Sequence, residues 1–192
     1  MSHTTARDGS SHPTTPATPT SRVFPWSKWV LIAAILAALL AYFRIRGGNI
    51  KDAMIRPTVV LDARFGFTPA TVRDTLSALG PQGRKLYTEM NRVDFVLMPL
   101  VLREFLLNTF PPTSPRSGAI RDTFANAYAL GDITENVFVM VFLKGYPTVW
   151  DPFAWACCFG NVLKWSAFYA ACLSILYEFV VYLRGGVEVR TQ

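Results

Sequence analysis

Four apolar stretches, separated by polar and charged segments, organise the chain. They lie at about 23–43, 93–110, 123–143 and 153–183. A helix rises about 1.5 Å per residue, so about 20 residues cross a hydrocarbon layer of about 30 Å. The pattern therefore predicts an all-α integral membrane four-helix bundle, formed by residues 23–184, in which each stretch is a membrane-spanning helix.

The two ends of the chain differ in composition from this helical region. Residues 1–22 are rich in Ser, Thr and Pro and have no apolar period, so they cannot bury enough surface to offset the entropy lost on ordering. We expect them to form a disordered N-terminal tail. Residues 185–192 follow the last apolar stretch as a short C-terminal tail.

The composition and the distribution of charge agree with a membrane protein. Apolar residues make up 51% of the chain and charged residues 17%, whereas soluble domains contain about 25% charged residues. Nine of the 19 Lys and Arg residues lie in the connector 44–92, between the first two stretches. By the positive-inside bias this connector faces the cytoplasm, or the matrix of a mitochondrion, and the sequence leaves the organelle open. The basic charge favours a lipid bilayer, including anionic lipid, over nucleic acid as the partner.

The connector contains a short helical pattern of its own. Thr68 can cap a helix that begins at Pro69, and Gly80 with Pro81 ends it. Apolar residues recur within it at helical spacing, at Val72, Leu76 and Leu79. We predict an interfacial amphipathic helix that lays this stripe on the membrane surface. A second, longer helix then continues into the second span.

Ionisable residues within the apolar stretches are the main candidates for a functional site. A charge at the bilayer centre costs at least about 2.5 to 3.5 kcal/mol, so such side chains face one another or a wet cavity. Depth counted along the helices pairs Arg103 with Asp132, and Lys164 with Glu135. Asn136 shares the helix face of the two acids at the i+3 and i+4 spacing. The predicted polar cluster consists of Asp132, Glu135, Asn136, Lys164 and Arg103.

Two further patterns bear on how this cluster is built. On the fourth stretch, polar and small residues form one stripe that should face the third: Cys157, Asn161, Lys164, Phe168, Ala171 and Glu178. On the second, Asp94 and Arg103 are nine positions apart and point to opposite sides, so Arg103 joins the cluster only if Pro99 bends the helix inward. Asp94 is then expected near the interface, opposite Arg84, Lys85 or Lys144. Arg84, Tyr87 and Asp94 are secondary candidates.

Several kinds of catalytic site are excluded by the residues present. The two histidines, His3 and His12, lie in the N-terminal tail, so the helical region can form neither a His-based metal site nor a Ser-His triad. The three cysteines lie in the last stretch and show no redox or metal spacing. No glycine-rich phosphate-binding loop precedes a helix. We therefore expect no metal and no cofactor.

The polar residues also carry a resemblance to a known family. The motifs, in order, are Gly83-Arg84-x-x-Tyr87, Asp94-x4-Pro99, Asp132-x-x-Glu135-Asn136, Tyr146-Pro147 and Lys164-Trp165. They resemble a family of small, uncharacterised four-span integral membrane proteins, over about residues 61–183. The resemblance implies a helical membrane bundle and brings no known activity.

Two classes of function remain open. The favoured one is a non-enzymatic scaffold, assembly component or protein that binds lipid or an unidentified protein partner, in which the buried charges fix helix register. The alternative is a proton-linked carrier, or a membrane-embedded enzyme acting on a lipid headgroup, with Asp132 and Glu135 as proton acceptors or ligands. Without an inverted repeat or a catalytic motif, the sequence weighs against an enzyme without deciding the question.

Overall fold

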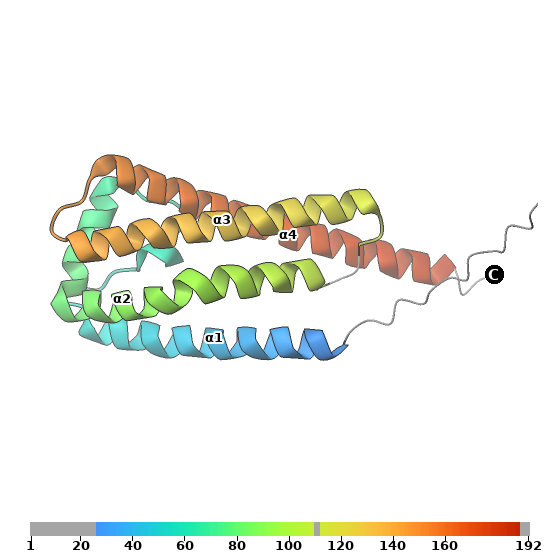
Figure 1. Cartoon of the computed structure of the whole chain (residues 1–192), viewed down its shortest axis with the longest axis horizontal. Helices are drawn as coiled ribbons and strands as arrows, with labels where there is room; N and C mark the ends of the chain where they lie inside the picture. Colours follow the sequence, from blue (N-terminus) through green and yellow to red (C-terminus); the bar gives the residue numbers. More distant parts are fainter. Residues whose placement is uncertain (1–25, 110–111, 189–192) are drawn as a thin grey trace, which may run out of the picture.

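The computed structural model describes residues 26–109 and 112–188 and consists of four long helices (Figure 1). They are α1 (Trp26–Ala53), α2 (Pro69–Asn108), α3 (Pro115–Gly145) and α4 (Asp151–Glu188), with a short 3-10 helix, η1 (Leu61–Ala63), between α1 and α2. Successive helices run in opposite directions, so α1 begins and α4 ends at the same end of the bundle. No strand occurs in the described ranges, and the prediction of an all-α four-helix bundle is confirmed.

Local sequence explains where α2 and α3 begin. Thr68 accepts a hydrogen bond from the backbone N–H of Thr71 at 3.2 Å, and the Thr71 hydroxyl accepts one in return from the N–H of Thr68. Ser114 and Ser117 form the same reciprocal pair in front of α3. A proline follows each cap, where its missing N–H is harmless. The cap at Thr68 was predicted, whereas α3 begins well before the predicted residue 123.

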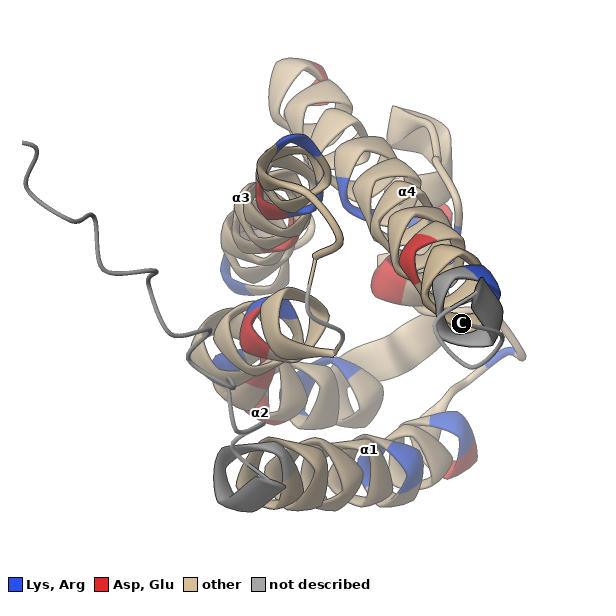
Figure 2. Ribbon diagram, turned by 90° about the vertical axis from the view of Figure 1, so that its right-hand side faces the viewer, with Lys and Arg blue, Asp and Glu red and all other residues tan. Residues whose placement is uncertain are grey.

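The helices pack in chain order rather than as a closed square. α1 packs against α2, α2 against α3, and α3 against α4. Figure 2 shows α1 on one side of α2, with α3 and α4 on the other. Many side chains of α1 are therefore exposed, including Val30, Leu31 and Leu40.

α2 is bent at Gly80, where the backbone adopts a φ of +65° and leaves the helical conformation. The segment before the bend, residues 69–79, lies across one end of the bundle (Figure 1), which we call the connector end. Val72, Leu76 and Leu79 on this segment are fully buried in the protein interior. The prediction that this stripe rests on the membrane is therefore wrong, because the apolar ends of α3 and α4 already offer it a surface, at Val139, Phe142, Leu143, Ala154 and Cys157.

The interior is divided into two apolar clusters with a polar layer between them. Along α3, residues 139–143 belong to the cluster at the connector end, 125–129 to the cluster at the far end, and 132–136 to the layer between. The far cluster consists of Leu106, Ala125, Tyr128, Ala129, Ala167 and Ala171. The candidates Asp132, Glu135 and Asn136 thus sit in the middle of the bundle rather than at either end.

Two of the four helices, in the ranges Val30–Ala53 and Asp151–Arg184, are long and apolar enough to cross a membrane by length and composition alone. Four such helices were predicted. The sequences of α2 and α3 contain more charge, including Arg103, Glu104 and Asp132.

The predicted tails fall mostly beyond the part of the chain that the structure describes. The predicted disordered tail, residues 1–22, lies outside it entirely. Residues 185–188, expected to open the C-terminal tail, instead continue α4 to Glu188. The remainder, 189–192, lies outside the described residues.

Candidate functional site

A layer of buried polar side chains crosses the bundle between the two apolar clusters. We call it the polar layer and define it as Asn91 and Asp94 of α2, Asp132, Glu135 and Asn136 of α3, and Asn161 and Lys164 of α4. None of the seven is more than 8% exposed. Burial of this kind is costly unless charges are paired and polar groups hydrogen-bonded, so the contacts within the layer decide what it can do.

Lys164 forms the centre of the polar layer. Its ammonium Nζ lies 3.3 Å from Oδ1 of Asp132 and makes a second, closer ion pair with Oε2 of Glu135. The two acids are three positions apart on α3 and so present their carboxylates on one face. The expected pair of Lys164 with Glu135 is present, and Asp132 pairs with the same lysine.

Two glycines allow this contact by bringing the backbones of α3 and α4 together. A Cβ atom on Gly131 would lie 2.6 Å from the backbone nitrogen of Lys164 and 2.7 Å from the carbonyl oxygen of Gly160. A Cβ on Gly160 would lie 2.9 Å from the backbone nitrogen of Glu135. No side chain fits at either position, and small residues are what let two helices approach closely.

An amide links the ion pairs to the loop between α1 and α2, residues 54–68. Asn161 donates from Nδ2 to Oε1 of Glu135 at 2.9 Å. Its Oδ1 accepts from the backbone N–H of Gly66 at 2.7 Å. The N–H of Phe67 donates to Sγ of Cys158 at 3.3 Å. These contacts fasten residues 66 and 67 to α4 beside the polar layer.

A second branch of hydrogen bonds reaches α2. Asn91 donates from Nδ2 to Oδ1 of Asn136 at 2.9 Å. The hydroxyl of Tyr128 donates to Oδ2 of Asp132 at 3.1 Å. Three helices and the loop 54–68 therefore share one polar network. Such a network stabilises a single arrangement when its polar groups have hydrogen-bond partners.

Arg103 does not join the polar layer, and the predicted pair with Asp132 is wrong. Its Nε donates to Oδ1 of Asn126 at 2.7 Å, and its Nη1 pairs with Oε1 of Glu104. The cause is the register of α2 against α3. Asn91 lies opposite Asn136, so in this antiparallel pair residue 95 lies opposite Asp132 and Arg103 is eight positions further along, about 12 Å at the helical rise.

Asp94 takes the place on α2 that was expected for Arg103. Its predicted position at the interface, opposite Arg84, Lys85 or Lys144, is wrong because Asp94 is 8% exposed and lies in the layer. The layer therefore contains three acids, Asp94, Asp132 and Glu135, and one base, Lys164. Asp94 has no ion pair among the described residues.

Arg84 and Tyr87, the other secondary candidates, lie at the connector end and outside the layer. Nη1 of Arg84 donates to the carbonyl oxygen of Leu76 at 2.9 Å, and the guanidinium lies 3.9 Å from the ring centroid of Tyr146. The bend at Gly80 interrupts the helix, and carbonyls of the turn before such a break lose helical partners. Arg84 thus stabilises the bend.

Tyr87 is fully buried and its hydroxyl donates to Oδ1 of Asp62 at 2.7 Å. Burial, and then the charges of Asp62 and Glu135, raise the pKa of Tyr87 well above its ordinary value. The phenol therefore remains a donor over the physiological pH range. It anchors η1 inside the bundle.

Sequence reasoning found part of this site and missed part of it. The predicted stripe on α4 is buried at Cys157, Asn161, Lys164, Ala171 and Glu178. Asp62, Asn91, Tyr128 and the two glycines were not singled out. Gly131 and Gly160 did carry a signal, since a glycine inside an apolar helix indicates close approach of another backbone.

Groups that could hold a metal ion were sought in the described part of the chain. There, no three His, Cys, Asp or Glu side chains are arranged for this purpose. Cys157, Cys158 and Cys172 are free thiols. Comparisons with models of protein families, with curated proteins and with solved structures find no match to this chain.

Proposed function

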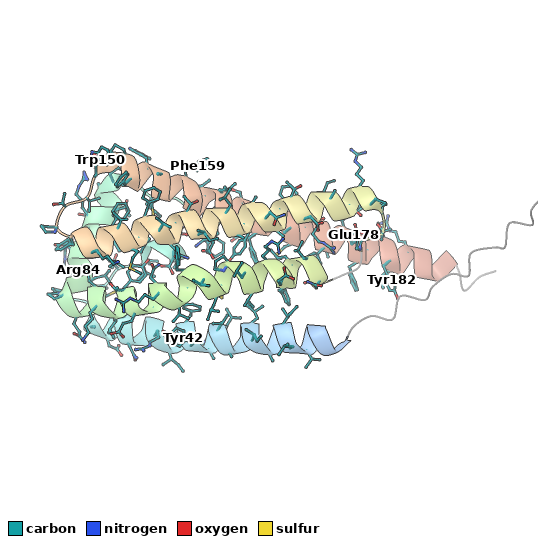
Figure 3. All side chains as sticks on the ribbon, viewed as in Figure 1. Tyr42, Arg84, Trp150, Phe159, Glu178 and Tyr182 are labelled. Carbon is teal, nitrogen blue, oxygen red and sulfur yellow. The ribbon has the colours of Figure 1, made fainter. Side chains whose placement is uncertain are left out.

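We propose that the protein is a non-enzymatic integral membrane component, a four-helix scaffold that binds lipid or a protein partner. One observation carries the proposal: polar side chains point into the bundle while large apolar side chains cover its outside. Phe159, for example, is 67% exposed on the outer face of α4 (Figure 3). Other exposed apolar side chains on α2, α3 and α4 are Phe95, Val96, Leu97, Leu100, Leu130, Val137, Val141, Leu173 and Leu176.

This arrangement supports a lipid environment over an aqueous one. Soluble monomers rarely expose apolar patches larger than a few hundred Å², and here such side chains occur on every long helix. α1 and α4 qualify as membrane spans by composition. In this proposal α2 and α3 enter the bilayer with them, because four of the five charged side chains in residues 93–110 and 123–143 are paired. Asp132 and Glu135 pair with Lys164, and Arg103 pairs with Glu104.

The orientation follows from the basic connector. Residues 44–92 contain nine Lys and Arg residues, and the positive-inside bias places them on the cytoplasmic side, or on the matrix side of a mitochondrial membrane. The segment 69–79 would then lie at that surface, with its apolar stripe against the bundle rather than against lipid.

The contacts of the polar layer support a structural role for it. Lys164 is held by two carboxylates where the backbones of α3 and α4 approach closely. Hydrogen bonds of Asn136 and Asn161 extend the same layer to α2 and to the loop between α1 and α2. Buried polar networks of this kind can fix one helix register among several of similar energy. A scaffold needs such a fixed arrangement in order to present a constant surface.

Membrane insertion can be tested directly in cells that express the full chain. Membranes are washed with alkaline carbonate, which releases peripheral proteins and leaves inserted ones in the pellet. We expect the protein in the pellet, together with an inserted control protein. Recovery in the supernatant would overturn the proposal.

A second candidate function is favoured by the excess of acid in the polar layer. Asp94, Asp132 and Glu135 face a single base, Lys164, and unmatched carboxylates within membranes occur in proton pathways. The test is proton uptake into proteoliposomes under an imposed pH gradient, read with an enclosed pH-sensitive dye. Uptake that is lost in Glu135→Gln, at unchanged protein stability, would replace the scaffold with a proton-linked carrier. Absence of uptake above that of empty liposomes supports the scaffold.

A further inference from the structure

An open groove runs between α2 and α3 on the outside of the bundle. It has a volume of about 350 Å³ and is lined by Arg92 and Phe95 of α2 and by Val137, Met140, Val141 and Lys144 of α3. Except for Met140, these residues are exposed. The volume falls within the range of about 300 to 1,000 Å³ that small-ligand sites occupy.

The lining of the groove combines two basic side chains with an apolar floor. Arg92 directly precedes the second apolar stretch and Lys144 directly follows the third, so both belong to the same side of the bundle as the basic connector. The four apolar residues lie within those stretches. The groove thus combines positive charge at the membrane boundary with apolar surface deeper in the bilayer. A phospholipid has the complementary arrangement, with an anionic headgroup at the boundary and acyl chains below it.

The two bases of the groove are not used by the protein itself. Elsewhere, Arg46 pairs with Glu89, Arg73 with Asp151, and Lys164 with its two acids. Within the described ranges, neither Arg92 nor Lys144 has an ion pair with an acid. Both charges are therefore available to a ligand.

We propose that this groove binds an anionic phospholipid, with the phosphate held by Arg92 and Lys144 and an acyl chain lying along Phe95, Val137, Met140 and Val141. The inference rests on the proposed placement in a membrane. Basic pockets between helices on the cytoplasmic or matrix side are a recurrent form of anionic-lipid site. The apolar floor distinguishes this ligand from a free phosphate ion, which would gain nothing from it.

Native mass spectrometry of the full chain in detergent can measure this binding, with phosphatidylglycerol as the probe and phosphatidylcholine of the same chain length as the neutral comparison. The test variant carries Arg92→Gln and Lys144→Gln. The control carries Arg56→Gln and Lys85→Gln, two exposed bases outside the groove, so both proteins lose the same charge. We expect the affinity for phosphatidylglycerol to fall roughly 25-fold in the test variant, since each basic residue contributes about fivefold, and to change little in the control.

A second variant tests the apolar part of the site without altering its charge. Val141→Trp fills the groove and should weaken binding of phosphatidylglycerol while Arg92 and Lys144 remain. Equal losses in the groove variant and in the charge-matched control would overturn the site, because they would show attraction to the basic surface as a whole. Competition by inorganic phosphate at equal concentration would also overturn it in favour of a phosphate site.

Failure of the groove can be separated from failure of the membrane placement. Release of the protein by alkaline carbonate removes the placement and the lipid site together. Retention in the membrane, combined with unchanged binding of phosphatidylglycerol by the Arg92→Gln and Lys144→Gln variant, overturns the groove alone.

Discussion

Gly131 of α3 and Gly160 of α4 face each other so closely that a Cβ on Gly131 would lie 2.7 Å from the carbonyl oxygen of Gly160. Asp132 follows Gly131 in the chain, and Lys164 lies one helical turn beyond Gly160. The ion pair between them therefore forms beside a close approach of the two backbones. The close contact and the polar layer are two parts of one interface.

Gly131→Ala should destabilise the protein by about 1 to 3 kcal/mol, since overpacking forces backbone to move. The added methyl would meet the backbone nitrogen of Lys164 at 2.6 Å, and backbone cannot rotate away as a side chain can. Gly48→Ala in α1 is the matched control, because nothing lies within 4 Å of its Cβ position. There the higher helix propensity of alanine should leave stability unchanged or raised. Thermal unfolding in detergent, followed by circular dichroism, measures both, and equal effects would contradict the close contact.

Lys164→Met should lower stability by about 3 to 5 kcal/mol, because it leaves buried carboxylates without their base. Adding Glu135→Gln should recover part of this loss, since the amide removes one unpaired charge and can still accept from Asn161. A double-mutant cycle in detergent gives the coupling energy. Simple additivity of the two single losses would show that the residues are not in contact.

The exposed pair of Arg73 with Asp151 serves as the comparison for that cycle. Nη1 of Arg73 lies 2.6 Å from Oδ1 of Asp151, yet the side chain of Arg73 is 45% exposed and that of Asp151 is 57% exposed. Exposed pairs contribute about 0 to 1 kcal/mol, so Arg73→Met should change the free energy of unfolding by less than about 1 kcal/mol. A loss as large as that of Lys164→Met would mean that burial does not set the value of these pairs.

Tyr87→Phe should cost about 1 kcal/mol, because the ring stays in place while the hydrogen bond to Asp62 is lost. Loss of this bond loosens η1, so the loop 54–68 should become more sensitive to limited proteolysis, which gel electrophoresis detects. Tyr169→Phe is the control, as this side chain is 55% exposed. If both variants are cleaved at the rate of the unaltered protein, the hydroxyl of Tyr87 does not hold the loop 54–68 in place.

Gly80→Ala should be destabilising for two separable reasons. Its φ of +65° disfavours any side chain, and the new Cβ would lie 2.6 Å from the side chain of Ile55. Ile55→Ala removes the second cause, so in the Gly80→Ala background it should restore part of the thermal stability and leave the conformational cost of about 1 to 3 kcal/mol. Gly145→Ala, with open space around it, should be near neutral. Full rescue by Ile55→Ala would show that backbone conformation at residue 80 is unimportant.

Local patterns identified the features that depend on residues near one another in the chain. The cap at Thr68, the break at Gly80 and the inward stripe of α4 were all predicted from spacing. These three predictions are confirmed because hydrogen bonds at helix ends and the period of a helix involve residues only a few positions apart.

Features set by the contact of two distant segments were predicted less well. The stripe of Val72, Leu76 and Leu79 is amphipathic, and amphipathicity alone cannot tell a lipid surface from a protein one. Arg103 was matched to Asp132 by depth counted from an assumed membrane boundary, whereas packing of Asn91 on Asn136 sets the true register. Asp94, nine positions before Arg103 on α2, therefore occupies the place in the layer that was expected for Arg103.

The sequence by itself determined that the chain forms long apolar helices and that Asp132, Glu135 and Asn136 share a face opposite Lys164, because helical period and the cost of buried charge act within each segment. Only the tertiary structure decided that Asp94 and not Arg103 completes the layer, that Gly131 and Gly160 set its geometry, and that Asp62 enters the bundle to meet Tyr87. Those outcomes depend on helix register and on the path of a connector, which arise from the summed packing of residues far apart in the chain.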